Sequence, residues 1–298
     1  MRITNNTLSE GIVRQIQHLS ENQSKLQTQV ATGQKLFQAE DDPAAVGRVL
    51  GLESEQRQVA QFTSNADHAL ELSQATYSTL QEIKKVCDRA TEIGTLAGGI
   101  ISPESSRAYA AEVNQLIGQT LELSNTKFRN DSLFAGTAVD ATPFAATRDA
   151  QGNVTAVSYV GNDNQAPIQL SNNASVTPGS PGTMNRGLGD FLNHLAALRD
   201  SLSSGNSSQL ADIQTGLVAS EDGLVSAIAD HGGIQTRIQA SRAQLQQRGD
   251  SLETLVSTET DADLPSTIVR LNQNQTAYQA ALQSAANIMR ISLLDYIK

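Results

Sequence analysis

Four histidines are the side chains of this 298-residue chain that could most readily bind a metal or move a proton. A metal site on a helix needs a second histidine three or four residues after the first, so that both face one ion. None of the four has such a partner: His18, His68, His194 and His231. We therefore expect solvent-facing or helix-end histidines, and we predict no metal site.

Two groups of carboxylates could instead perform acid–base chemistry or bind calcium. Residues 41–43 are Asp-Asp-Pro, and an Asp directly before a Pro is typical of a helix start, so we expect capping there. Residues 259–263, Glu-Thr-Asp-Ala-Asp, are similar to the start of a calcium loop. However, Leu264 stands where the sharp turn needs Gly, and Arg270 stands where a bidentate Glu should close the loop.

Candidate nucleophiles and phosphate loops are equally incomplete. Ser124 and Lys127 have S-x-x-K spacing but lie in a predicted helix without the companion motifs. Gly187-Leu-Gly189 lacks the third glycine and the preceding strand of a dinucleotide loop. Cys87, the single cysteine, falls on an apolar stripe and is interpreted as a small core residue. We therefore predict no catalytic site, no cofactor and no enzymatic activity.

The composition excludes two classes of partner. The chain has 21 Lys and Arg against 31 Asp and Glu, a net charge of −10, and no basic stripe, which argues against nucleic-acid binding. No stretch approaches the roughly 20 apolar residues of a membrane span, so we expect no membrane insertion. Only 17% of residues are charged, 4% are aromatic and Trp is absent. The core must consist mostly of Leu, Ile, Val and Ala.

Both ends of the chain carry an apolar stripe with steps of three and four residues, the spacing of a coiled-coil seam. The amino-terminal stripe is Leu8, Ile12, Ile16, Leu19, Gln23, Leu26 and Val30. The carboxyl-terminal stripe is Ile268, Leu271, Gln275, Tyr278, Leu282, Ala285 and Met289. Each contains a Gln and is flanked by uncharged amides, so either helix alone would be marginal in water.

Further helices lie between these ends. A long helix is predicted over 43–97, stopped by Gly98-Gly99, and the next one starts at Ser102-Pro103. After the middle region, we expect one helix ended by Gly205 and another running from Leu210 to Gly232-Gly233. A last segment then starts at Ile234 and continues towards Asp263.

Helix length predicts the shape. A helix over 43–97 would be roughly 80 Å long, whereas a compact sphere of this chain would be about 50 Å across. We therefore expect an elongated antiparallel helical bundle, with both termini at the same end.

The middle region, 131–185, has a different character. It holds four of the seven prolines, several glycines and few charges. Strands are predicted at 154–160 and 167–170, which indicates a small β-rich insertion at the tip of the bundle. A disordered linker is the alternative interpretation. The domains we expect are 1–42 with 262–298 as a terminal coiled coil, 43–130 with 186–261 as an inner helical rod, and 131–185 as the insertion.

Several motifs together resemble a known family. The opening Met-Arg-Ile-Thr, the run Val-Ala-Thr-Gly-Gln-Lys-Leu-Phe at 30–37 and Glu-Asp-Asp-Pro-Ala-Ala at 40–45 are similar to the amino-terminal signature of bacterial flagellins and their relatives. Ser-Leu-Phe-Ala-Gly-Thr-Ala at 132–138 and the carboxyl end at 275–297 are most similar to flagellar hook-filament junction proteins, the third hook-associated proteins. The resemblance covers residues 1 to about 145 and 230–298.

The resemblance implies a structural subunit of the bacterial flagellum, forming the junction ring between hook and filament on which flagellin polymerises. It implies extracellular assembly after export without a cleaved signal peptide. The implied partners are further copies in a homo-oligomeric ring, the first hook-associated protein on the hook side, flagellin and a flagellar export chaperone. Two alternatives remain: a short or minor flagellin that forms the filament itself, and a coiled-coil signalling rod.

An assembly role falls on apolar positions of the terminal helices. These are Leu8, Ile12, Ile16, Leu19, Leu26, Val30, Ile268, Leu271, Leu282, Met289, Leu293 and Leu294. Ordinary packing within one chain is the competing interpretation of the same residues, and one helix can serve both purposes.

Overall fold

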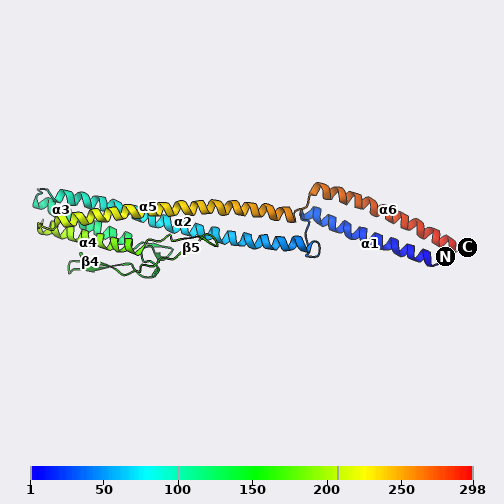
Figure 1. The fold of residues 1–298 in the computed structure, drawn as a ribbon, viewed down its shortest axis with the longest axis horizontal. Coiled ribbons are helices and arrows are strands. Elements are labelled where there is room, and N and C mark those ends of the chain that lie inside the picture. The colour runs from blue at the N-terminus through cyan, green and yellow to red at the C-terminus, as the bar shows by residue number, and fades with distance from the viewer. Residues whose placement is uncertain (1, 100, 207, 297–298) are drawn as a thin grey trace. The chain divides into compact units, whose positions relative to one another are not determined.

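The computed structural model describes residues 2–99, 101–206 and 208–296; for 2–9 and 288–296 it describes the backbone without the side chains. The described helices are α1 (Arg2–Thr32), α2 (Pro43–Ala97), α3 (Pro103–Ser124), α4 (Gly182–Ser204), α5 (Leu210–Thr260) and α6 (Leu264–Tyr296) (Figure 1). The described strands are β1 (Lys127–Phe128), β2 (Asp131–Ser132), β3 (Phe144–Arg148), β4 (Val154–Tyr159), β5 (Ile168–Gln169) and β6 (Ser175–Val176). The predicted fold class, mainly α with a small β-rich insertion, is confirmed.

The chain divides into two compact units. One consists of residues 1–57 with 249–298, and the other of residues 58–248. The helices α2 and α5 each contribute to both units. The first unit contains the paired terminal helices, and the second contains the hydrophobic core and the β-rich insertion.

Local capping signals place the helix starts where the sequence predicts them. The carboxylate of Asp42 accepts hydrogen bonds from the backbone N–H groups of Ala44 and Ala45, which caps α2. The hydroxyl of Ser102 accepts from the N–H of Ser105 and caps α3. Gly205 ends α4 in the left-handed conformation, at φ 70°.

One predicted helix boundary is wrong. Gly232-Gly233 does not end a helix, because α5 runs without interruption from Leu210 to Thr260 (Figure 1). Leu224 before the pair and Ile238 after it are both buried, so tertiary packing continues the helix through two residues of low helix propensity.

Within the 58–248 unit, α2 and α5 run antiparallel in a constant register. Side-chain contacts show this, because the α5 partner has a higher residue number as the α2 residue number falls. The pairs are Gly94 with Gln214, Lys84 with Glu221, Ser73 with His231, and Asp67 with Arg242. Two separate hydrophobic clusters line this pair. The larger joins α2, α3, α4, α5 and the β3–β4 hairpin, and the smaller joins α2, α5, β5 and β6.

The insertion is built from short antiparallel pairs. The predicted strands near 154–160 and 167–170 are present as β4 and β5. Their partners β3 and β6 were not predicted, and neither was the small β1–β2 pair. The turn at 134–137 joins this region to the bundle: Phe134 is fully buried, and the N–H of Thr137 donates to the side chain of Asn162.

The turn requires a glycine at position 136. Its φ is +68°, and a Cβ added there would lie 2.3 Å from the carbonyl oxygen of Asn162. Only glycine fits both conditions. The motif that resembles junction proteins is therefore a packing element of the insertion.

Candidate assembly surface

The terminal helices α1 and α6 pair with each other in the first unit. The side-chain amide of Asn274 donates to the carbonyl of Leu19 at 2.8 Å and ties the two helices together. Asp263 starts α6, where its carbonyl accepts from both the N–H and the hydroxyl of Thr267.

This helix pair buries little. Among the side chains that the structure describes in α1, residues 10–32, none is fully buried. Among those described in α6, residues 264–287, only Thr267 and Ala285 are buried. Among these described side chains, no large apolar one is thus fully removed from water by this pairing, although such burial is the main stabilising contribution to a coiled coil.

The inward face of α6 differs from the predicted seam. Its buried and half-buried positions include Thr267, Leu271, Asn274, Gln275, Tyr278, Ala281 and Ala285. Leu271, Gln275, Tyr278 and Ala285 were predicted to lie there, but Ile268 and Leu282 are each 44% exposed. The face therefore turns towards smaller and more polar residues, and two large apolar side chains are left at its edge.

The structure places the proposed assembly residues in three groups. Half-buried against the partner helix are Ile12, Ile16, Leu19, Leu26, Val30 and Leu271. Largely exposed are Ile268 and Leu282. The side chains of Leu8, Met289, Leu293 and Leu294 lie outside the described part of the structure.

Among the described side chains of these helices, three further large apolar residues are exposed that the predicted stripes do not include: Val13, Leu264 and Val269. For Leu264 and Val269 a signal exists in the charge pattern: between residues 264 and 287 the only charged residue is Arg270. Exposed helix faces normally carry charges, and the centres of protein interfaces are depleted of them. An apolar, nearly uncharged face fits a surface that a neighbour covers.

The connection between the terminal pair and the longer helices is closely bonded. Gln34 and Asp261 form an isolated antiparallel β-bridge. The N–H of Lys35 donates to the carbonyl of Thr260, and the N–H of Ala262 donates to the carbonyl of Gly33. The guanidinium of Arg48 forms two hydrogen bonds with the carboxylate of Glu259.

Asp41 fixes the loop that leads into α2. Its carboxylate accepts from the ammonium of Lys25 and from the N–H groups of Phe37 and Gln38. These bonds lower the pKa of Asp41 to about 2, the Lys25 bond most strongly. The Asp41-Asp42 pair thus has local structural partners, as the capping interpretation expects.

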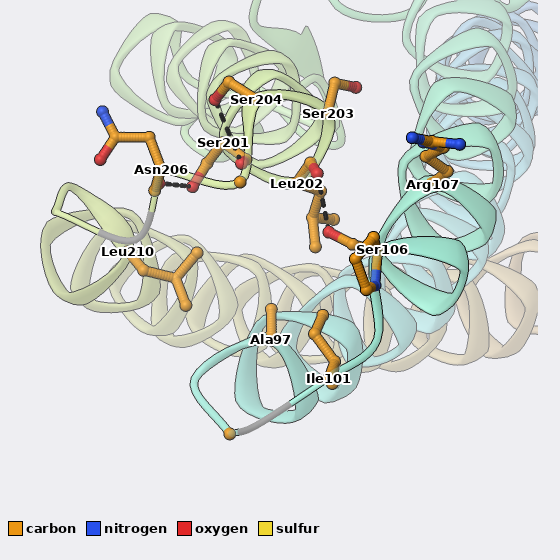
Figure 2. A pocket seen from close by; sticks show the side chains of 13 residues that line it. Ala97, Ile101, Ser106, Arg107, Ser201, Leu202, Ser203, Ser204, Asn206 and Leu210 are labelled. Atoms are coloured by element: carbon orange, nitrogen blue, oxygen red, sulfur yellow. Dashed lines mark hydrogen bonds between the residues drawn. The ribbon is translucent and has the colours of Figure 1, made fainter.

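The described surface offers one polar recess at the end of the bundle, where α2, α3, α4 and α5 begin or end (Figure 2). Its volume is about 500 Å³. The hydroxyl of Ser106 donates to the carbonyl of Leu202, and that of Ser201 to the carbonyl of Asn206. Arg107 is the one ionisable side chain of this lining, so the recess holds no acid–base pair.

The residues that could do chemistry lie apart. Cys87 is fully buried, and desolvation raises its pKa to about 12, so the thiol packs as a core group. His194 packs against Gly216, in the space where a Cβ would stand. His231 is buried next to Ser73, and His18 is bonded to Asn22.

In the part of the chain that the structure describes, no three His, Cys, Asp or Glu side chains come together as they would around a metal ion. No described helix combines the length and the apolar character that crossing a membrane requires.

Comparison with known proteins gives three findings. Residues 3–139 match the family described as the bacterial flagellin N-terminal helical region. Flagellar hook-associated protein 3 of Escherichia coli is 22% identical over 328 aligned positions that cover both chains completely, and flagellin B of Rhizobium meliloti is 26% identical over 85% of this chain and 64% of its own. The crystal structure of FlgL from Bacillus cereus shares the fold with a TM-score of 0.60 and 17% identity, over 70% of this chain and 99% of that one.

Proposed function

We propose that this chain, a flagellin-like protein related to flagellar hook-associated protein 3, is the structural subunit that joins hook and filament in the bacterial flagellum. The comparisons favour this function over that of a minor flagellin. The observation that carries the proposal is the terminal helix pair, whose α1 lies in the matched region 3–139 and which leaves large apolar side chains uncovered.

Assembly would cover the apolar side chains that the terminal helix pair leaves exposed. Ile268 and Leu282 lie at the edge of the α1–α6 pair, where a neighbouring subunit can cover them without disturbing the contact between α1 and α6. Each fully buried Leu or Ile side chain contributes roughly 1.5–3 kcal/mol. A few such residues in each of several subunits would stabilise the assembly, and folding of the terminal helices would be coupled to it.

The proposal includes specific partners and a location. Further copies of the chain would form a ring, with the first hook-associated protein on the hook side and flagellin on the filament side. A flagellar export chaperone would hold the chain before export, and export would proceed without a cleaved signal peptide to the outside of the cell. We assign no catalytic role, metal or cofactor. The proposed domains remain 1–42 with 262–298, 43–130 with 186–261, and 131–185.

Gene deletion tests the function. Without this protein, cells should build hooks and secrete flagellin as monomers into the medium, because the filament lacks its base. Electron microscopy and flagellin immunoblots of the medium would show this. Normal filaments in the deletion strain would overturn the proposal.

A second candidate function, a short flagellin, is favoured by the 26% identity to flagellin B over most of this chain. The purified protein distinguishes the two. A flagellin subunit should polymerise alone into long filaments when seeded, whereas a junction subunit should stop after one ring or remain soluble.

A further inference from the structure

The two hydrophobic clusters of the 58–248 unit are separated by a polar layer between α2 and α5. On α2 this layer consists of Ser73, Thr76 and Thr79, and on α5 of His231, all of them buried. Ser73 Oγ lies 3.3 Å from Nδ1 of His231. Neither hydrophobic cluster includes any of these four residues. The layer thus places buried polar side chains between the two clusters, while the half-buried Leu72 and Ala75 of the same α2 segment pack against the larger one.

On α5 the same layer contains the two adjacent glycines Gly232 and Gly233. Neither has positive φ, and a Cβ added at either would meet nothing within 4 Å. No turn and no close contact in this chain therefore requires glycine, although glycine is the least favourable residue after proline in a helix interior. Gly216 in the same helix differs, because the ring of His194 occupies the space of its missing Cβ.

On α2, backbone carbonyls of the layer accept hydrogen bonds from side-chain hydroxyls as well as from the helix backbone. The hydroxyl of Thr76 donates to the carbonyl of Leu72, and those of Ser78 and Thr79 both donate to that of Ala75. Side-chain bonds of this kind weaken and bend helices. Gln235 of α5 also donates to the carbonyl of Ser73, which links the two weakened segments.

A hollow beside α5 leaves room for movement. A groove of about 730 Å³ lies next to the layer and is lined by Asp230, His231 and Gly233 of α5 together with Gly179 and Met184. An α5 segment that bends towards it meets open space. Glycine and serine pairs are among the usual sites of sharp helix kinks.

We propose that the layer of Ser73–Thr79 and His231–Gly233 is a hinge at which α2 and α5 bend together, between the two hydrophobic clusters. The weakened segments of α2 and α5 lie opposite each other, so both helices can bend at the same level of the pair. Under the proposed function, such a hinge would let a junction subunit follow a bending hook, and only this consequence rests on that function.

Hydrogen exchange on the full chain tests the hinge. The N–H groups of 232–237 should exchange at least about tenfold faster than those of 217–224 in the same helix, because local opening exposes them first. The variant Gly232→Ala/Gly233→Ala should slow exchange at 232–237 at least about fivefold. Gly223→Ala is the matched control, since Gly223 lies in the same helix with the same open space, and it should leave 232–237 unchanged.

A distance measurement gives an independent readout. Spin labels at Asp222→Cys and Ala243→Cys, both exposed on α5, would lie about 32 Å apart in a straight helix. Cys87 is fully buried and should not react with the label. The hinge predicts a broad distance distribution that the double alanine variant narrows. Equal exchange along α5, or distributions of the same width in both proteins, would overturn the proposal.

Discussion

The side chain of Asn193 on α4 bonds both backbone groups of Val157 on β4: its oxygen accepts from the N–H at 2.8 Å, and its nitrogen donates to the carbonyl at 3.0 Å. Asn125, after α3, does the same for Phe144 on β3. Each asparagine side chain thus makes the two backbone hydrogen bonds that a neighbouring strand would otherwise make. The β3–β4 hairpin is thereby held at both edges by the helical bundle.

We expect Asn193→Ala to loosen this hairpin, because the Val157 groups lose both partners. The free energy of unfolding should fall by about 1–3 kcal/mol, and exchange of the Val157 amide should accelerate. Asn193→Asp is the control: it keeps the acceptor for the N–H and should lose less. Equal losses for the two variants, measured by urea unfolding, would contradict the paired bonds.

Gly136→Ala should destabilise the insertion, because the new Cβ would collide with the carbonyl oxygen of Asn162. We expect a loss of about 2–4 kcal/mol in unfolding free energy. Gly152→Ala shares the positive φ, +87°, but meets open space, so it should cost only about 1 kcal/mol. Thermal unfolding of both variants measures the difference, and a milder effect at Gly136 would refute the steric explanation.

The stability of the protein should decrease below neutral pH because of His231. Burial lowers the pKa of His231, so as the pH falls the unfolded chain takes up this proton first. The contribution is complete above the ordinary pKa of about 6.5 and is lost as the pH falls below it towards the lowered value. Carboxylates such as Asp41, with its pKa of about 2, titrate below this window.

Urea unfolding between about pH 7.5 and pH 5.5 measures this effect. His231→Gln should remove part of the pH dependence. The control is His68→Gln, the same substitution at an exposed histidine of α2. If both variants keep the wild-type slope, His231 is not its source.

Removal of about the first 40 and last 35 residues should leave a soluble, folded monomer. Both hydrophobic clusters lie within 58–248, so the core keeps its contacts. Circular dichroism and size-exclusion chromatography of the truncated chain provide the measurement. Loss of most of the helical signal would show that the terminal pair is needed to fold the rest.

The amino-acid sequence was sufficient to predict an element where the signal for it is local. The start of α2 follows from Asp42-Pro43, and its hydrogen bonds depend on residues two and three positions away. Sequence failed where distant contacts decide: Gly232-Gly233 lies in mid-helix because Leu224 and Ile238 are packed on either side. The strands β3 and β6 pair with β4 and β5, which lie only a few residues away, but their own residues carry little β signal.

The orientation of α6 was predicted only in part, for a similar reason. A stripe with steps of three and four residues leaves open which edge of the stripe faces the partner helix. In α6, Asn274 faces inward, where its side-chain amide donates to the carbonyl of Leu19 on α1, and Thr267 is also buried. Ile268 and Leu282 are consequently displaced to the outer edge. Hydrophobicity alone would have placed them inside.

The most direct test of the assembly surface is the incorporation of Leu282→Asp into flagella of the deletion strain. A charge at this exposed position should be tolerated in the monomer but costly once a neighbour covers it. We therefore predict normal export and normal circular dichroism, with incorporation and motility lost. Gln283→Asp, which adds the same charge at the next exposed residue, should assemble normally. Normal incorporation of Leu282→Asp would contradict the account.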